Sequence, residues 1–141
     1  EVAPEVKKLV EVTYDCIWEG IKCVRPGARI GDIGEAISSL AHSHNYSVVE
    51  EYCGHGIGRE FHEEPQVVHV AKGGTGPVMK PGMTFTIEPM INLGKPGCKV
   101  LDDEWTVITV DGKYSAQFEH TILVTDSGYD VLTLRSDEEL R

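Results

Sequence analysis

The chain has 141 residues, with 23 acidic residues against 13 lysines and arginines, and its formal net charge is −10 at pH 7. Because a nucleic-acid-binding surface needs a basic patch and the chain has no Lys/Arg cluster, this balance disfavours a nucleic-acid partner. No apolar run approaches the roughly 20 residues that span a bilayer, and no secretory signal opens the chain, so we expect no membrane partner.

Two amphipathic helices are predicted first. The earlier one covers residues 1–24, where apolar side chains recur close to the 3.6-residue period and Pro4 suits the first turn. A turn containing proline and glycine ends it. The later helix covers residues 30–45. Its polar end carries His42 and His44, which complement the helix dipole and which we interpret as structural or solvated.

Strands are predicted for most of the remaining chain. We expect them over five segments rich in β-branched and aromatic residues, at 46–52, 83–90, 105–110, 114–125 and 129–134. Residues 91–103 are expected to form a loop, and Asp111-Gly112 is a strong hairpin signal between two of the strands. Two helices followed by an antiparallel meander make an α+β domain over residues 1–135, with a charged, frayed tail at 136–141.

Residues 52–65 form the most unusual stretch, because three glycines alternate with other residues around His55. Glycine permits close backbone approaches, so an imidazole in such a loop can face a cleft. Histidine is the commonest metal ligand and the commonest proton carrier near neutral pH. His62 follows seven residues later, beside two carboxylates and a proline. The alternative interpretation is a glycine-rich loop with two incidental histidines.

Two glutamates lie within apolar strand segments, Glu88 after Phe85-Thr86-Ile87 and Glu119 after Gln117-Phe118. A carboxylate in such a setting is costly unless it is paired or binds a metal, and neither segment supplies a Lys or Arg. Together with His55, the two glutamates make a plausible ligand set for a divalent ion. The alternative is that each glutamate lies on the solvent face of its strand.

Other catalytic motifs do not fit. The two histidines of residues 52–65 are too far apart for H-E-x-x-H, and no Walker A or nucleophile-elbow pattern is present. Cys53 close to His55 could suggest a thiol nucleophile, but no third orienting residue is identifiable. The four cysteines show no C-x-x-C spacing, which is typical of reduced thiols.

Three blocks of sequence, taken together, resemble type I methionine aminopeptidases. They are Tyr52-Cys53-Gly54-His55-Gly56-Ile57-Gly58 with Phe61-His62-Glu63-Glu64-Pro65, then Met83-Thr84-Phe85-Thr86-Ile87-Glu88-Pro89-Met90, then Ser115-Ala116-Gln117-Phe118-Glu119-His120-Thr121. The resemblance covers nearly the whole chain. It implies the C-terminal half of the "pita-bread" fold, with two helices and a curved antiparallel sheet. Prolidases and aminopeptidase P enzymes share this fold, but their last glutamate has a different sequence context.

The resemblance also implies roles for individual residues. His55, Glu88 and Glu119 would bind a pair of divalent ions, with Glu119 bridging them and Glu88 also carrying a proton. His62 would contact the scissile amide of the substrate. Phe61 and Trp105 match residues that line the pocket for the methionine side chain.

The implied reaction is hydrolytic removal of the initiator methionine from nascent polypeptides, at the ribosome, when the second residue is small. Two-metal sites of this kind activate a water and polarise the carbonyl under attack. The mixed nitrogen and oxygen donors suit cobalt, manganese, iron or zinc. We expect a cytoplasmic protein, with an organelle left open as the alternative.

One departure from the family pattern limits these expectations. The family has two aspartate ligands on a hairpin before the first helix, and no aspartate here has that context. We therefore expect the N-terminal half to be missing, at most one ion to bind, and this chain alone to be inactive or nearly so. Exposed sheet surface then predicts self-association. The alternative functions are a non-enzymatic binding module of the same fold and an Xaa-Pro peptidase.

Overall fold

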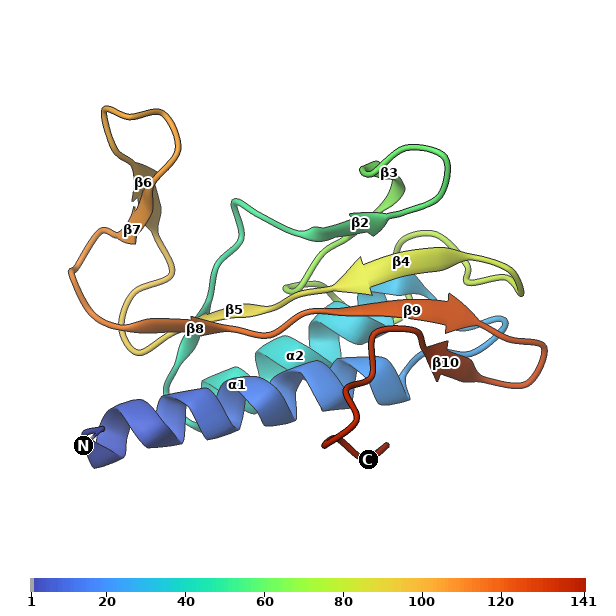
Figure 1. Ribbon diagram of the computed structural model, residues 1–141, viewed down its shortest axis with the longest axis horizontal. Coiled ribbons are helices and arrows are strands. Elements are labelled where there is room, and N and C mark those ends of the chain that lie inside the picture. The colour runs from blue at the N-terminus through green and yellow to red at the C-terminus, as the bar shows by residue number, and fades with distance from the viewer. Residues whose placement is uncertain (1) are drawn as a thin grey trace.

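A computed structural model describes residues 2–141 and confirms both predicted helices (Figure 1). Helix α1 spans Pro4–Lys22 and helix α2 spans Ile30–Ser43. Residue 1, which the predicted helix included, lies outside the described residues. The two helices pack closely, because a Cβ on Gly20 would meet the Ile37 side chain at 2.8 Å. In the described part of the chain, no helix is long and apolar enough to cross a membrane.

Within the described residues, ten short strands follow the helices and form three sheets. The strands are β1 (Ser47–Val48), β2 (Gly54–Gly56), β3 (Glu63–Val67), β4 (Thr84–Ile87), β5 (Met90–Asn92), β6 (Cys98–Val100), β7 (Val107–Thr109), β8 (Ser115–Gln117), β9 (His120–Val124) and β10 (Tyr129–Val131). The strand orders are β10-β9-β4-β2-β3, β1-β5-β8 and β6-β7. All these pairings are antiparallel, which confirms the α+β class.

The simple meander expected from the sequence is wrong, because strands that are neighbours in the sheets are often distant in the chain. Strand β4 lies between β2 and β9, and β5 lies between β1 and β8. These orders place segments from both halves of the chain side by side. The site described below depends on this arrangement, because its residues come from three separate segments.

Both helices lie on the same side of the sheets, and the core fills the space between them (Figure 1). The largest fully buried side chains come from both layers: Leu9, Ile17, Trp18, Ile21, Ile30, Ile33, Ile37, Met79, Phe85, Ile87, Ile91 and Ile122. Burying this much apolar surface is the main favourable term in folding. Tyr52 and Phe61, by contrast, are exposed.

The expected loop at residues 91–103 is wrong in part, because β6 forms inside it and pairs with β7. Together they make a hairpin that stands away from the other sheets (Figure 1). The turn at Asp111-Gly112 is present, with Gly112 at a φ of 68°. It does not join a pair of hydrogen-bonded strands, however, because β7 pairs with β6 while β8 pairs with β5.

Part of the C-terminal tail packs against α1 and β9 through Glu138, a contact that the expectation of a frayed segment did not include. The side chain of Glu138 is 1% exposed and accepts hydrogen bonds from Tyr14 Oη at 2.5 Å and from His120 Nε2 at 3.2 Å. Arg141 pairs with Asp15 of α1 at 2.5 Å. The charged composition of the tail suggested that it is solvated. The Glu138 carboxylate can nevertheless be buried, because hydrogen bonds from its partners compensate for the loss of water.

Candidate metal centre

His55 lies in the middle of strand β2, so the expected loop position is wrong. Strand β2 is hydrogen-bonded to β3 on one side and to β4 on the other. The flanking glycines make this possible, because a Cβ on Gly54 would collide with the carbonyl oxygen of Thr86, and one on Gly56 would collide with that of Glu64. The alternation of glycine and histidine thus lets a crowded strand carry one imidazole.

Glu88 and Glu119 lie at the same end of the β4–β9 ladder. Its last pair is Ile87 with His120, so Glu88 follows one member and Glu119 precedes the other. Both glutamates occupy breaks where the chain passes between the sheets of β4–β9 and β5–β8. The sequence predicted unbroken strands at 83–90 and 114–125, and these interruptions are corrections to it.

The structure brings the three predicted metal ligands together. One donor atom from each of His55, Glu88 and Glu119 lies within 4.8 Å of the others. His55 and Glu88 are half-buried, and Glu119 is exposed. Among the described residues, this is the one group of three such side chains with converging donors. Its composition of one imidazole and two carboxylates fits a divalent transition-metal ion.

Hydrogen bonds orient the donors. Nδ1 of His55 lies 2.9 Å from the carbonyl oxygen of Gly56, and a carbonyl can only accept, so Nδ1 carries the proton. The lone pair of Nε2 is then free, and this atom lies 3.6 Å from Oε1 of Glu88. Thr86 Oγ1 donates to the same carboxylate oxygen at 2.7 Å and accepts from the His55 backbone N–H at 3.0 Å.

The charge of Glu88 is disfavoured in the absence of a cation. Burial raises the pKa of its carboxyl, and the neighbouring Glu119 carboxylate raises it further, while the Thr86 hydrogen bond and the two histidines oppose the shift. In the part of the chain that the structure describes, no lysine or arginine lies within salt-bridge distance of Glu88, and His55 is its one histidine neighbour at that distance. A bound divalent ion would relieve this repulsion, so the electrostatics also fit a metal.

Two of the three predicted substrate-binding residues lie beside the predicted metal ligands. The rings of His62 and His55 are 4.2 Å apart between centroids, and the rings of Phe61 and His62 are 4.5 Å apart. The Phe61 side chain is 69% exposed, so it is available to a ligand. Trp105 instead lies between β6 and β7 on the projecting hairpin, where it is 86% exposed. Its predicted role stays a prediction.

Three further residues that touch Glu88 were not predicted from the sequence. Thr86 and Gln117 each lie two residues before a ligand, and side chains two apart share a face of a strand, so alternation could have indicated them. His69 has no such signal. Its buried Nε2 accepts the backbone N–H of Glu88 at 3.1 Å, and burial lowers its pKa to about 4.

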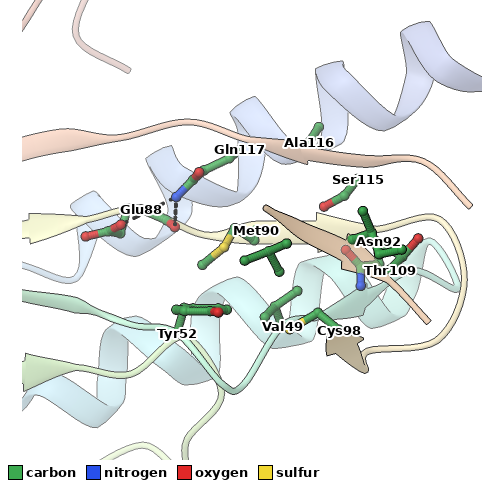
Figure 2. Close-up of a pocket in the computed structure, with 12 residues that line it drawn as sticks. Val49, Tyr52, Glu88, Met90, Asn92, Cys98, Thr109, Ser115, Ala116 and Gln117 are labelled. Atoms are coloured by element: carbon green, nitrogen blue, oxygen red, sulfur yellow. Dashed lines mark hydrogen bonds between the residues drawn. The ribbon is translucent and has the colours of Figure 1, made fainter. Parts of the chain in front are cut away.

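Two hollows meet at Glu88. One, of about 630 Å³, contains His55, His62 and Glu88 together with the acidic side chains of Glu63 and Glu64. The other, of about 480 Å³, runs from Glu88 toward the β6–β7 hairpin (Figure 2). Figure 2 shows apolar side chains along this second hollow and the Gln117 amide pointing at Glu88. Glu88 is therefore reachable from a polar side and from an apolar side.

The sequence model of metallopeptidase family M24 matches residues 1–126, which include all three predicted ligands. The chain belongs to metallopeptidase family M24. This membership confirms the resemblance on which the metal ligands were predicted. It also shows that the cluster of two glutamates and a histidine lies in a metallopeptidase sequence.

Individual members of the M24 family match the chain closely. Methionine aminopeptidase A of Synechocystis is 54% identical over 132 residues, which are 94% of this chain and 52% of that protein. The crystal structure of methionine aminopeptidase from Rickettsia prowazekii superposes with a TM-score of 0.93 at 53% identity, covering 95% of this chain and 54% of that one. The predicted fold class is thereby confirmed. This M24 chain spans about half the length of the curated relatives it matches.

A more distant likeness concerns the fold alone. The prolidase of Pyrococcus horikoshii superposes with a TM-score of 0.70 at 23% identity and covers all of this chain but 35% of that structure. A shared fold does not transfer an activity.

Proposed function

We propose that this M24 chain is the metal-binding half of a methionine aminopeptidase, which removes the N-terminal methionine from nascent proteins with a small second residue. The convergence of His55, Glu88 and Glu119 within 4.8 Å carries the proposal. The identity of 54% with a methionine aminopeptidase over most of the chain supports the substrate class.

The residues around the ligands suit peptide hydrolysis. His62 lies beside His55 and would donate a hydrogen bond to the amide under attack. Glu88, whose pKa is raised by burial, is suited to accept and release a proton. Phe61 offers an exposed aromatic surface for the methionine side chain, and Trp105 would join it. These roles make His62 and Glu88 the proposed catalytic pair.

His55, Glu88 and Glu119 would hold a single divalent ion in this chain, because three protein ligands leave an open coordination position. A bound ion of this kind polarises a carbonyl oxygen and lowers the pKa of a water. Cobalt, manganese, iron and zinc all suit the donor set, and the intact enzyme would hold two such ions.

We propose nascent polypeptide N-termini in the cytoplasm as the partners, met as chains emerge from the ribosome. Self-association of the 141-residue chain is a further proposal. Several apolar side chains are exposed on its sheets and on the β6–β7 hairpin, including Val100, Trp105 and Val107. Exposed apolar surface of this extent favours association with another protein surface. Sedimentation velocity at increasing chain concentration tests this, and a monomer at every concentration would contradict it.

Titration calorimetry with Mn²⁺ tests the metal site directly. The unchanged chain should bind about one ion, and His55→Ala and Glu119→Ala should abolish binding. Glu139→Ala, at an exposed glutamate in the tail, is the matched control and should bind as the unchanged chain does. Absence of binding by the unchanged chain would refute the proposed centre.

Peptide cleavage tests the reaction. The chain alone should release little or no methionine from Met-Ala-Ser. Joined to the N-terminal half of the Synechocystis relative, it should release methionine from that peptide and leave Ala-Pro peptides intact. Activity of the joined protein on Ala-Pro peptides would favour the Xaa-Pro alternative. No activity on either peptide, with Mn²⁺ bound, would favour a binding module.

A further inference from the structure

Glu88 lies at a point where the strand ladder leaves its backbone unpaired. The ladder between β4 and β9 ends with Ile87 and His120, and the next strand, β5, begins at Met90. The intervening residue Pro89 has no N–H to donate. The backbone N–H of Glu88 therefore needs a partner from outside the sheet. A buried N–H without one would cost free energy and leave the ligand poorly held.

His69 supplies that partner. Its Nε2 accepts the Glu88 N–H at 3.1 Å, from a position 19 residues earlier in the chain. An imidazole nitrogen that accepts a hydrogen bond carries no proton, so the ring is neutral and its proton is on Nδ1. Among the described residues, Nδ1 has no hydrogen-bond partner although His69 is 2% exposed. An apolar side chain there would avoid this unpaired donor.

The other side of Glu88 is held as well. The Gln117 amide donates to the Glu88 carbonyl oxygen at 3.2 Å, and its Nε2 lies 3.4 Å from the carboxylate, as Figure 2 shows. Thr86 donates to the other carboxylate oxygen. The N–H, the carbonyl and the carboxylate of this one residue are thus each bound by a different side chain. Thr86 lies two residues before Glu88 and Gln117 lies two residues before Glu119, whereas His69 comes from a separate segment.

We propose that His69 is a positioning residue for the metal ligand Glu88, acting through the hydrogen bond from the Glu88 backbone to its neutral imidazole. The inference rests on the proposed metal centre. Leaving the Nδ1 donor of His69 unpaired costs free energy. In return, Nε2 of His69 holds the backbone at the break between β4 and β5, and this backbone conformation points the Glu88 carboxylate toward His55 and Glu119. Partners behind metal ligands typically change metal affinity by about 10- to 100-fold.

Two substitutions separate this role from simple packing. His69→Leu fills the space without an acceptor, while a glutamine in His69→Gln is long enough to place an oxygen near the position of Nε2. We expect His69→Leu to bind Co²⁺ about 10- to 100-fold more weakly than the unchanged chain, with an altered visible spectrum of the bound ion. His69→Gln should stay within a few-fold. Equal affinities for all three proteins would overturn the proposal, as would a loss in His69→Gln equal to that in His69→Leu.

A stability control distinguishes positioning from a weakened fold. Ile33→Ala removes a fully buried side chain in α2, away from the ligands, and should lower Tm without changing Co²⁺ affinity. Weaker Co²⁺ binding by Ile33→Ala, to the same degree as by His69→Leu, would overturn the proposal. If the unchanged chain bound no Co²⁺, the metal centre itself would fail. If Co²⁺ bound with the same affinity whatever the side chain at residue 69, the positioning role of His69 would be refuted and the metal centre would stand.

Nitrogen NMR of the unchanged chain tests the hydrogen bond without any substitution. Nε2 of His69 should be unprotonated and Nδ1 protonated at pH 7, as the hydrogen bond to Nε2 requires. The Glu88 amide proton should exchange slowly with solvent. A proton on Nε2, or fast exchange at Glu88, would overturn the proposal even if His69→Leu failed to fold.

Discussion

Thr86 is the residue that connects the two most buried ligands, because its hydroxyl contacts both the His55 backbone and the Glu88 carboxylate. The sequence predicted His55, Glu88 and Glu119 from residue types and motif context, and the structure brings their donor atoms within 4.8 Å of one another. It did not indicate the side chains that orient them. Alternation along a strand could have indicated Thr86, whereas His69 acts across 19 residues and no local pattern records that contact.

Thr86→Val keeps the shape of the side chain and removes the hydroxyl. We expect Mn²⁺ affinity to fall about 10-fold, because Glu88 loses the donor that orients it. Stability should fall by about 1 kcal/mol. Calorimetry and urea unfolding measure the two effects. The control is Thr13→Val in α1, whose hydroxyl bonds the Leu9 carbonyl and should affect stability alone. Equal Mn²⁺ binding by both variants would contradict this role of Thr86.

Glu88→Gln separates binding from stability. Because the folded-state pKa of Glu88 is raised, its protonated form favours folding. Its stabilising contribution is present below the pKa of the unfolded chain and is lost as pH rises through the folded-state value. The metal-free variant should therefore have a higher Tm than the unchanged chain at pH 7, with the difference vanishing at acid pH. Mn²⁺ binding should weaken more than about 100-fold. A lower Tm at pH 7 would refute the argument.

At the scale of secondary-structure elements, the position of the site depends on breaks between strands. The sequence predicted one strand at 83–90, which covers β4 and only the first residue of β5, and one strand at 114–125, which joins β8 and β9. Pro89 is a local signal for the first break. The second, at Phe118-Glu119, has none, because it arises where β8 pairs with β5 and β9 pairs with β4. Period-two patterns record which residues are extended and cannot record which strand they will pair with.

Gly54→Ala tests the close approach of β2 to β4. A Cβ there would collide with the backbone carbonyl of Thr86, which cannot move without breaking the ladder. We expect a loss of about 3 kcal/mol in urea unfolding and weaker Mn²⁺ binding, because His55 follows directly. Gly128→Ala is the matched control, since a Cβ there meets nothing within 4 Å. Similar stabilities for the two variants would show that β2 can shift freely.

At the scale of the whole molecule, the C-terminal segment ties the sheets to α1. Glu138 bonds Tyr14 of the helix and His120 of β9, directly beside the predicted ligand Glu119, and the tail ends beside α1 (Figure 1). The composition of residues 136–141 is that of a solvated tail. The carboxylate is nevertheless buried because its partners, 124 and 18 residues away in the chain, meet at one place.

Glu138→Ala should destabilise the chain by about 2 kcal/mol, because Tyr14 and His120 both lose a buried partner. Burial alone would raise the pKa of Glu138, but the hydrogen bonds from Tyr14, the Arg135 N–H and His120 lower it overall. A lowered folded-state pKa means that the stabilisation is present above the pKa of the unfolded chain and is lost as pH falls through the folded-state value.

The difference in unfolding free energy between the unchanged chain and Glu138→Ala should therefore be largest at pH 7. It should decrease as the pH falls below the ordinary pKa range of carboxyl groups. Urea unfolding across pH measures it, with Glu139→Ala, at an exposed neighbour, as the control that should show no such difference. A difference independent of pH would mean that the side chain acts by packing and not by charge. Mn²⁺ affinity should fall less than in His55→Ala, because Glu138 acts on the start of β9 and touches no ligand.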